Sequence, residues 1–101
     1  MLRLILTDEA KQDLLGIRQY TQAKWGALQA KAYLSELRNT LKRLQEQPLI
    51  GTDQSVDLGV GVFGFPFVSH MLYYRIKDNN LIVLGILHQS MVPSLHLRPP
   101  H

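Results

Sequence analysis

Two strand-like runs around a short polar turn, between Ser69 and His88, constrain the fold of this chain most strongly. The flanks are rich in β-branched and aromatic residues, which suit the pleated surface of a sheet. The Asp-Asn-Asn turn at 78–80 contains residue types that tolerate the left-handed backbone of tight hairpins. The second run is apolar without alternation from Leu81 to Leu87. This run therefore predicts a central strand that is covered on both faces.

The first half of the chain predicts a short strand at 2–6 followed by two helices. Thr7 is expected to cap a first helix from Asp8 to about Lys24, because its hydroxyl can accept from the first turn. A second helix is expected from Ala27 to about Gln47, between Gly26 and Pro48. The apolar stripes at helical spacing are Ala10, Leu14, Ile17 and Thr21, with Leu15 beside them, and then Ala30, Tyr33, Leu34, Leu37, Leu41 and Leu44.

Glycines interleaved with Asp53 and Asp57 predict a loop between Pro48 and the hairpin, with a short strand at 60–63. Pro66 predicts that the strand leading into the hairpin begins after it or at a sheet edge. Residues 89–97 are expected to hold a short turn, and 98–101 to be a frayed tail. The order strand, helix, helix, strands predicts one α+β domain over 1–101, an αα-hairpin packed on a small, mainly antiparallel sheet.

Composition excludes several classes of protein and of site. The 101 residues contain no cysteine, so a cytosolic protein without disulfides or a Cys-based metal site is expected. The four histidines are dispersed and match no zinc spacing, and no metal or cofactor is expected. No stretch approaches the roughly 20 apolar residues of a membrane span, and the apolar start is too short for a signal peptide.

The net charge of +3 is placed unevenly along the chain. Eight basic and five acidic residues precede Pro48, whereas three of each follow it. This bias is compatible with an acidic protein partner or with nucleic acid, and it selects neither. It lies below the basic density of a dedicated DNA binder, so no sequence-specific nucleic-acid binding by the chain alone is expected.

A set of short motifs in a fixed order carries a family resemblance. The helical hairpin is followed by Pro48-Leu49-Ile50-Gly51, Phe65-Pro66, Ser69-His70, Tyr73-Tyr74-Arg75-Ile76 and Leu87-His88-Gln89. This order resembles the ParE branch of the ParE/RelE toxin superfamily over nearly the whole chain. The Tyr-Tyr-Arg-Ile strand, followed about a dozen residues later by Leu-His-Gln, is the most specific part.

The resemblance implies a small cytosolic bacterial toxin encoded beside a labile antitoxin. ParE-like members are described as poisons of DNA gyrase without nuclease activity, whereas RelE-like members are ribosome-dependent mRNA endonucleases. In ParE-like complexes the antitoxin tail packs against the helical hairpin and the sheet. The resemblance therefore implies a ParD-like antitoxin with an acidic C-terminal tail as partner, DNA gyrase as target, and a non-enzymatic mechanism.

Two positions depart from the family pattern. Phe63 stands where the family often carries an Arg before the Phe-Pro, and Thr52 stands where an Arg often follows the Gly of the Pro-Leu-x-Gly segment. Both departures reduce the basic surface of the loop. They weaken the nuclease interpretation most, and they leave open a degenerate homologue that binds an antitoxin without being toxic.

Two groups of candidate contact residues follow. The candidates for antitoxin binding are Trp25, Tyr33, Lys31, Arg38 and Lys42, and those for target binding are Arg75, His88, Gln89, Met91 and His96. An aromatic residue near a groove can anchor a partner helix, but it can equally close the core at the hairpin tip. A basic stripe on a helix is also commonly a solvated face.

RNA cleavage is the alternative activity. In-line attack by a 2′-hydroxyl needs a base, an acid and cations for the charge that develops on phosphorus. In that case Arg75 would stabilise charge and His88 would act as general acid or base. The last strand offers no second cation between Leu81 and Leu87, and structural roles for Arg75 and His88 are the simpler alternative.

Overall fold

The computed structural model describes residues 1–97, and the expected tail at 98–101 lies outside the described residues. The elements in chain order are β1 (Arg3–Leu6), α1 (Asp8–Trp25), α2 (Ala27–Glu46), β2 (Thr52–Asp53), α3 (Ser55–Leu58), β3 (Val62–Phe67), β4 (His70–Lys77) and β5 (Asn80–His88). Short 3₁₀ turns follow α2 at Pro48–Ile50 and β5 at Pro93–Leu95. The predicted α+β class, with an αα-hairpin after a first strand, is confirmed.

The five strands form one sheet in the order β1-β5-β4-β3-β2. Only β1 and β5 are parallel, so the sheet is mainly antiparallel, as predicted. β5 lies between β1 and β4, which explains its unbroken apolar run. Asp78 and Asn79 in the turn have φ angles of 51° and 64°, the left-handed conformation that their residue types tolerate.

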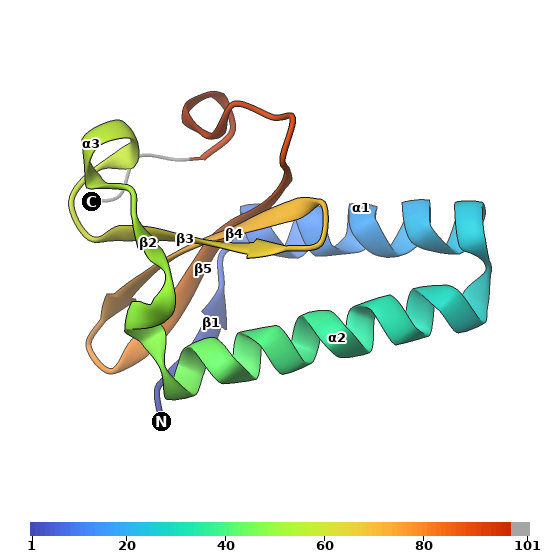
Figure 1. The fold of residues 1–101 in the computed structure, drawn as a ribbon, viewed down its shortest axis with the longest axis horizontal. Coiled ribbons are helices and arrows are strands. Elements are labelled where there is room, and N and C mark those ends of the chain that lie inside the picture. The colour runs from blue at the N-terminus through green and yellow to red at the C-terminus, as the bar shows by residue number, and fades with distance from the viewer. Residues whose placement is uncertain (98–101) are drawn as a thin grey trace.

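The two long helices begin and end close to the predicted residues. The Thr7 hydroxyl accepts from the Ala10 amide (3.1 Å) and donates to the Leu84 carbonyl (3.1 Å), so it fixes the start of α1 to the sheet. Gly26, at φ 91°, joins the helices at the tip of the hairpin. Figure 1 shows that α1 and α2 diverge from this tip, with β1 between their open ends.

The core lies between the helical hairpin and one face of the sheet. The buried residues that form it are Ala10, Ile17, Leu37, Leu41, Leu44, Phe67, Leu72, Tyr74, Leu81, Val83 and Ile86. Both long helices are amphipathic, and no helix in the described part of the chain is long and apolar enough to cross a bilayer. The buried Tyr74 hydroxyl donates to the Pro48 carbonyl (2.7 Å) and accepts from the Gly51 amide (3.2 Å), which ties the end of the α2 region to β4.

The segment predicted to be a loop contains more structure than its composition indicates. It includes β2, α3 and the start of β3. The strand expected at 60–63 is β3, which begins at Val62 and continues to Phe67. β3 begins before Pro66, so a start after this proline was the wrong alternative. Pro66 itself lies at a sheet edge, because β2 pairs only with Phe63 and Gly64 and does not extend along β3 to Pro66.

Candidate functional site

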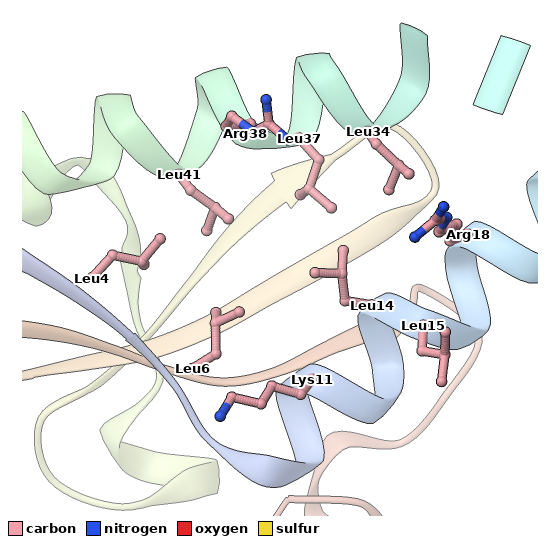
Figure 2. A pocket seen from close by; sticks show the side chains of 10 residues that line it. All are labelled: Leu4, Leu6, Lys11, Leu14, Leu15, Arg18, Leu34, Leu37, Arg38 and Leu41. Atoms are coloured by element: carbon pink, nitrogen blue, oxygen red, sulfur yellow. The ribbon is translucent and has the colours of Figure 1, made fainter. Parts of the chain in front are cut away.

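An apolar groove lies between α1, α2 and the outer strand β1 (Figure 2). Its first cavity encloses about 430 Å³, and its apolar lining consists of Leu4, Leu6, Leu14, Leu15, Leu34, Leu37 and Leu41. Figure 2 shows leucines of α2 pointing from one side and Leu14 and Leu6 from the other. Since Leu37 and Leu41 also belong to the buried core, the floor of the groove is held by the packing of the whole domain.

A second cavity of about 450 Å³ continues the groove toward the tip of the hairpin. Three of its lining residues, Arg18, Leu34 and Arg38, also line the first cavity. Ala27, Ala30 and Ser35 line the second cavity and have small side chains. A partner can therefore approach the backbone of α2 more closely here than over the leucines of the first cavity.

The charged residues along the groove all have the same sign. Lys11 lines the first cavity, Lys31 lines the second, and Arg18 and Arg38 line both. Within residues 1–97, no Asp or Glu lines either cavity. An apolar floor with a basic rim is complementary to an amphipathic segment whose polar face is acidic.

The structure divides the predicted antitoxin-binding residues into two groups. Arg38 and Lys31 line the groove, as described above. Lys42, Trp25 and Tyr33 line neither cavity. Trp25 is 61% exposed at the hairpin tip, with the Lys24 ammonium 5.2 Å from the centre of its ring. Tyr33 is half-buried on the side of α2 that faces the sheet, where it contacts His70 and Phe67.

Sequence reasoning missed the α1 side of the groove. The spacing of three or four residues that places side chains on one face of a helix could have identified this side, which contains Lys11, Leu14, Leu15, Arg18 and Gln22. Leu4 and Leu6 alternate with polar or exposed neighbours, but their position beside the hairpin depends on β1 pairing with β5. That pairing joins residues almost eighty positions apart and leaves no local signal.

The candidate target-binding residues Arg75 and His88 do not lie at one site. Arg75 is paired with Ile82 near the turn of the β-hairpin, whereas His88 is paired with His70 at its open end. Arg75 lies five positions along β4 from His70, about 17 Å at the rise of a strand. The register therefore does not bring the two candidate nuclease residues to a single phosphate group.

His88 instead belongs to a small cluster that links helix, sheet and C-terminal segment. The His70 Nδ1 atom lies 2.9 Å from the Tyr33 hydroxyl, and the rings of His70 and His88 have centroids 5.6 Å apart. The Nδ1 atom of His88 lies 2.8 Å from the Ser90 hydroxyl oxygen. Burial lowers the pKa of His70, and the adjacent His88 lowers that pKa further.

The remaining candidate target-binding residues lie on the C-terminal segment, defined here as residues 89–97. Gln89, Met91 and His96 are all exposed. Figure 1 shows this segment leaving the end of β5 and passing toward α3. The Leu97 side chain packs directly on Gly85 of β5, where an added Cβ atom would collide with it. This contact holds the end of the segment against the sheet.

The C-terminal segment also borders an acidic cavity of about 310 Å³ beside the start of α1. Asp8, Glu9 and Asp13 line this cavity together with His96. The Asp13 carboxylate accepts a hydrogen bond from the Ile86 amide (3.0 Å). Burial raises the pKa of Asp13, while the Ile86 hydrogen bond and the charge of His96 act in the opposite direction. No group of three side chains suited to holding a metal ion occurs within residues 1–97.

Comparisons with known proteins find relatives over most of this chain. Residues 4–93 match the family model described as "ParE toxin of type II toxin-antitoxin system, parDE". Toxin ParE1 of Caulobacter vibrioides is 34% identical over 92 residues, which cover 91% of this chain and 94% of that protein. Toxin ParE1 of Mycobacterium tuberculosis is 33% identical over 90 residues, 88% of this chain and 91% of that protein.

Solved structures show the same fold at lower identity. The chromosomal ParDE system of P. aeruginosa contains a chain with a TM-score of 0.74 and 21% identity, which covers 87% of this chain and 96% of that one. The M. tuberculosis toxin–antitoxin complex RelBE2 gives a TM-score of 0.62 and 21% identity, with 86% and 96% covered. The family match over nearly the whole length, with relatives above 30% identity, shows that this chain belongs to the ParE toxin family of type II toxin-antitoxin systems.

Proposed function

We propose that this protein inhibits DNA gyrase by binding it, and that a cognate ParD-like antitoxin neutralises it by occupying the groove between α1, α2 and β1. The observation that carries the antitoxin part is the groove itself, with its leucine floor and its exclusively basic charged lining among the described residues. Family membership supports the gyrase part. Such a toxin would act in the cytoplasm, where its target works.

The chemistry of the groove suits a tail that orders on binding. An acidic tail repels itself when free and is drawn to Lys11, Arg18, Lys31 and Arg38. Its apolar residues then cover the leucine floor, which supplies the affinity that offsets the entropy lost on ordering. β1 is one of the two outer strands of the sheet, so an extended part of the tail can add to its free edge.

Target contact in this proposal centres on the C-terminal segment. Gln89, Met91 and His96 present polar, apolar and titratable side chains on a short exposed stretch. Arg75 lies half-buried on β4, at the opposite end of the β-hairpin from His88. Any contact of Arg75 with the target would therefore belong to a second part of the surface.

The nuclease alternative is less well supported. The strand positions of its two candidate residues lie about 17 Å apart along the sheet, whereas a charge-stabilising arginine and an acid–base histidine must both reach the same phosphate. If the protein is instead a degenerate homologue without toxicity, its expression without an antitoxin should leave growth unchanged.

The decisive experiment is supercoiling of relaxed plasmid by purified gyrase, with and without the protein. We expect loss of supercoiling and accumulation of cleaved DNA, and full recovery when the product of the adjacent reading frame is added first. Replacing Met91 and His96 together with Ala should weaken inhibition, whereas Lys77→Ala, at the exposed turn end of β4, is the matched control. Unaffected gyrase in the presence of a protein that still arrests growth would contradict the gyrase target. Ribosome-bound mRNA would then be the next substrate to test.

A further inference from the structure

We infer that Arg18 and Arg38 form a clamp for one carboxylate of the antitoxin at the junction of the two cavities, and that this clamp sets the register of an acidic helix in the groove. This inference rests on the proposed function, because it takes the groove as the antitoxin site. It adds the position of the charge that the partner must carry and the length of the partner helix.

The two arginines lie on different helices of the hairpin. Arg18 comes from α1 and Arg38 from α2, and both line both cavities. Figure 2 shows one on each helix of the hairpin. Lys11 and Lys31 each line only one cavity, so they lie to either side of the junction. A planar guanidinium can donate two parallel hydrogen bonds to a carboxylate, which a lysine ammonium cannot do.

A partner that covers the groove changes the solvation of the two arginines. Arg18 and Arg38 are exposed in the free protein, and water solvates their charges. A bound helix would remove much of this water, and two covered cations without an anion would oppose binding. A partner of high affinity must therefore supply a carboxylate at the junction. An exposed pair of arginines on an ordinary solvated face would impose no such requirement.

The two cavities also define the length of the site. Along α2 the two cavities extend from Leu41 to Ala27, and Leu34 lies seven residues from each of them. The fourteen steps from Ala27 to Leu41 span about 21 Å at the rise of an α-helix, so about four turns of a partner helix cover both cavities. The partner then carries bulky apolar residues at one end, an acid near the middle, and residues that suit the alanine-lined cavity at the other.

The test measures binding of the full-length protein to the product of the adjacent reading frame by calorimetry, at low and moderate salt. We expect Arg18→Met and Arg38→Met each to weaken binding about tenfold, the effect of losing a hydrogen-bonded charge pair. Arg43→Met is the matched control, because Arg43 lies on α2 like Arg38 but packs over the Phe65 ring and lines neither cavity. This control should stay within about twofold.

A set of acid-to-amide changes in the partner then locates the clamped carboxylate. We expect one Glu→Gln or Asp→Asn change in the partner to weaken binding. Against that partner, Arg18→Met and Arg38→Met should cause little further loss of affinity, as a double-mutant cycle requires for a direct pair. Leu15→Asp, at an exposed position of the first cavity, tests the groove independently of the arginines.

The outcomes separate the two levels of the proposal. Arginine variants that bind within twofold of wild type, while Leu15→Asp abolishes binding, would overturn the clamp and leave the groove as the antitoxin site. Wild-type protein that does not bind the adjacent product, or binding that Leu15→Asp leaves unchanged, would overturn the groove and the clamp together. Circular dichroism of every variant checks that the change in affinity does not reflect unfolding.

Discussion

The groove and the C-terminal segment are two exposed regions of this protein that are built in opposite ways. The groove lies between two long helices, and its floor includes Leu37, which is 1% exposed and part of the core. The C-terminal segment consists of nine residues, mostly exposed, that hold to the domain through Leu97 at Gly85 and through His96 beside the acids of α1. One region cannot change shape without disturbing the core, and the other can.

This difference fits the two roles proposed for the regions. A site on rigid elements binds its partner without paying to order itself, which favours high affinity. A short segment with few buried contacts opens at low free energy and can adapt to a large target. We therefore expect substitutions of the buried floor residues Leu37 and Leu41 to affect stability and antitoxin binding together, and substitutions in the segment to affect target binding alone.

The largest expected effect comes from Leu37→Ala, which removes a buried side chain shared by the groove and the core. The free energy of unfolding should fall by about 3 kcal/mol, from lost burial and the cavity that remains. Urea unfolding measures it. Leu28→Ala on the same helix is the control, since Leu28 is 87% exposed and its loss should cost less than about 0.5 kcal/mol. A loss below 1 kcal/mol for Leu37→Ala would contradict a floor held by the core.

Gly85→Val should have the next largest effect, because its side chain would collide with Leu97 and approach the Asp13 carboxylate. We expect about 2 kcal/mol of destabilisation, as for overpacking, and faster hydrogen exchange across the C-terminal segment. Binding of the antitoxin should not change. Gly16→Ala in α1 is the matched control, because an added Cβ meets nothing there and should stabilise the helix slightly. Unchanged exchange in the segment would show that Leu97 does not hold it.

A smaller, pH-dependent effect is expected at the histidine cluster that links α2, the sheet and the C-terminal segment. The pKa of His70 is lowered from its ordinary value of 6.5, so the folded protein binds fewer protons there than the unfolded chain. Stability from this group is therefore complete above pH 6.5 and is lost as the pH falls toward the folded pKa. His70→Asn, which keeps an acceptor for Tyr33, should flatten this part of the stability profile.

NMR titration of His70 provides the control for that prediction. Because the charge of His88 contributes to the lowering, His88→Asn should move the pKa of His70 back toward its ordinary value. A His70 resonance that titrates identically in the wild type and in His88→Asn would show that burial alone lowers this pKa.

The smallest effect is expected from Lys42→Ala, on the basic stripe of α2 but outside both cavities. Its affinity for the antitoxin should stay within about twofold of wild type, as is usual for a solvated surface charge. A loss as large as that for Arg38→Met would show that the tail extends beyond the groove toward the end of α2. Comparing the two variants in one binding assay therefore maps the edge of the site.

Local sequence patterns determined much of this protein by themselves. Thr7 and Gly26 mark the ends of α1 because capping and left-handed backbone are properties of single residues and their neighbours. The Asp78–Asn79 turn and the apolar run of β5 identified the hairpin and its central position for the same reason. The family motifs lie on these elements, so the resemblance and the fold class could both be inferred without coordinates.

Only the tertiary structure decided where the functional surfaces lie. The parallel pairing of β1 with β5 brings Leu4 and Leu6 beside the helices, and the β4–β5 register places His88 beside His70 and far from Arg75. The packing of α1 beside α2 brings Arg18 and Arg38 to one groove, and Lys42 lies outside it. These relations depend on contacts between residues distant in sequence, and the pattern of one chain records which residues are apolar or charged but not which of them meet.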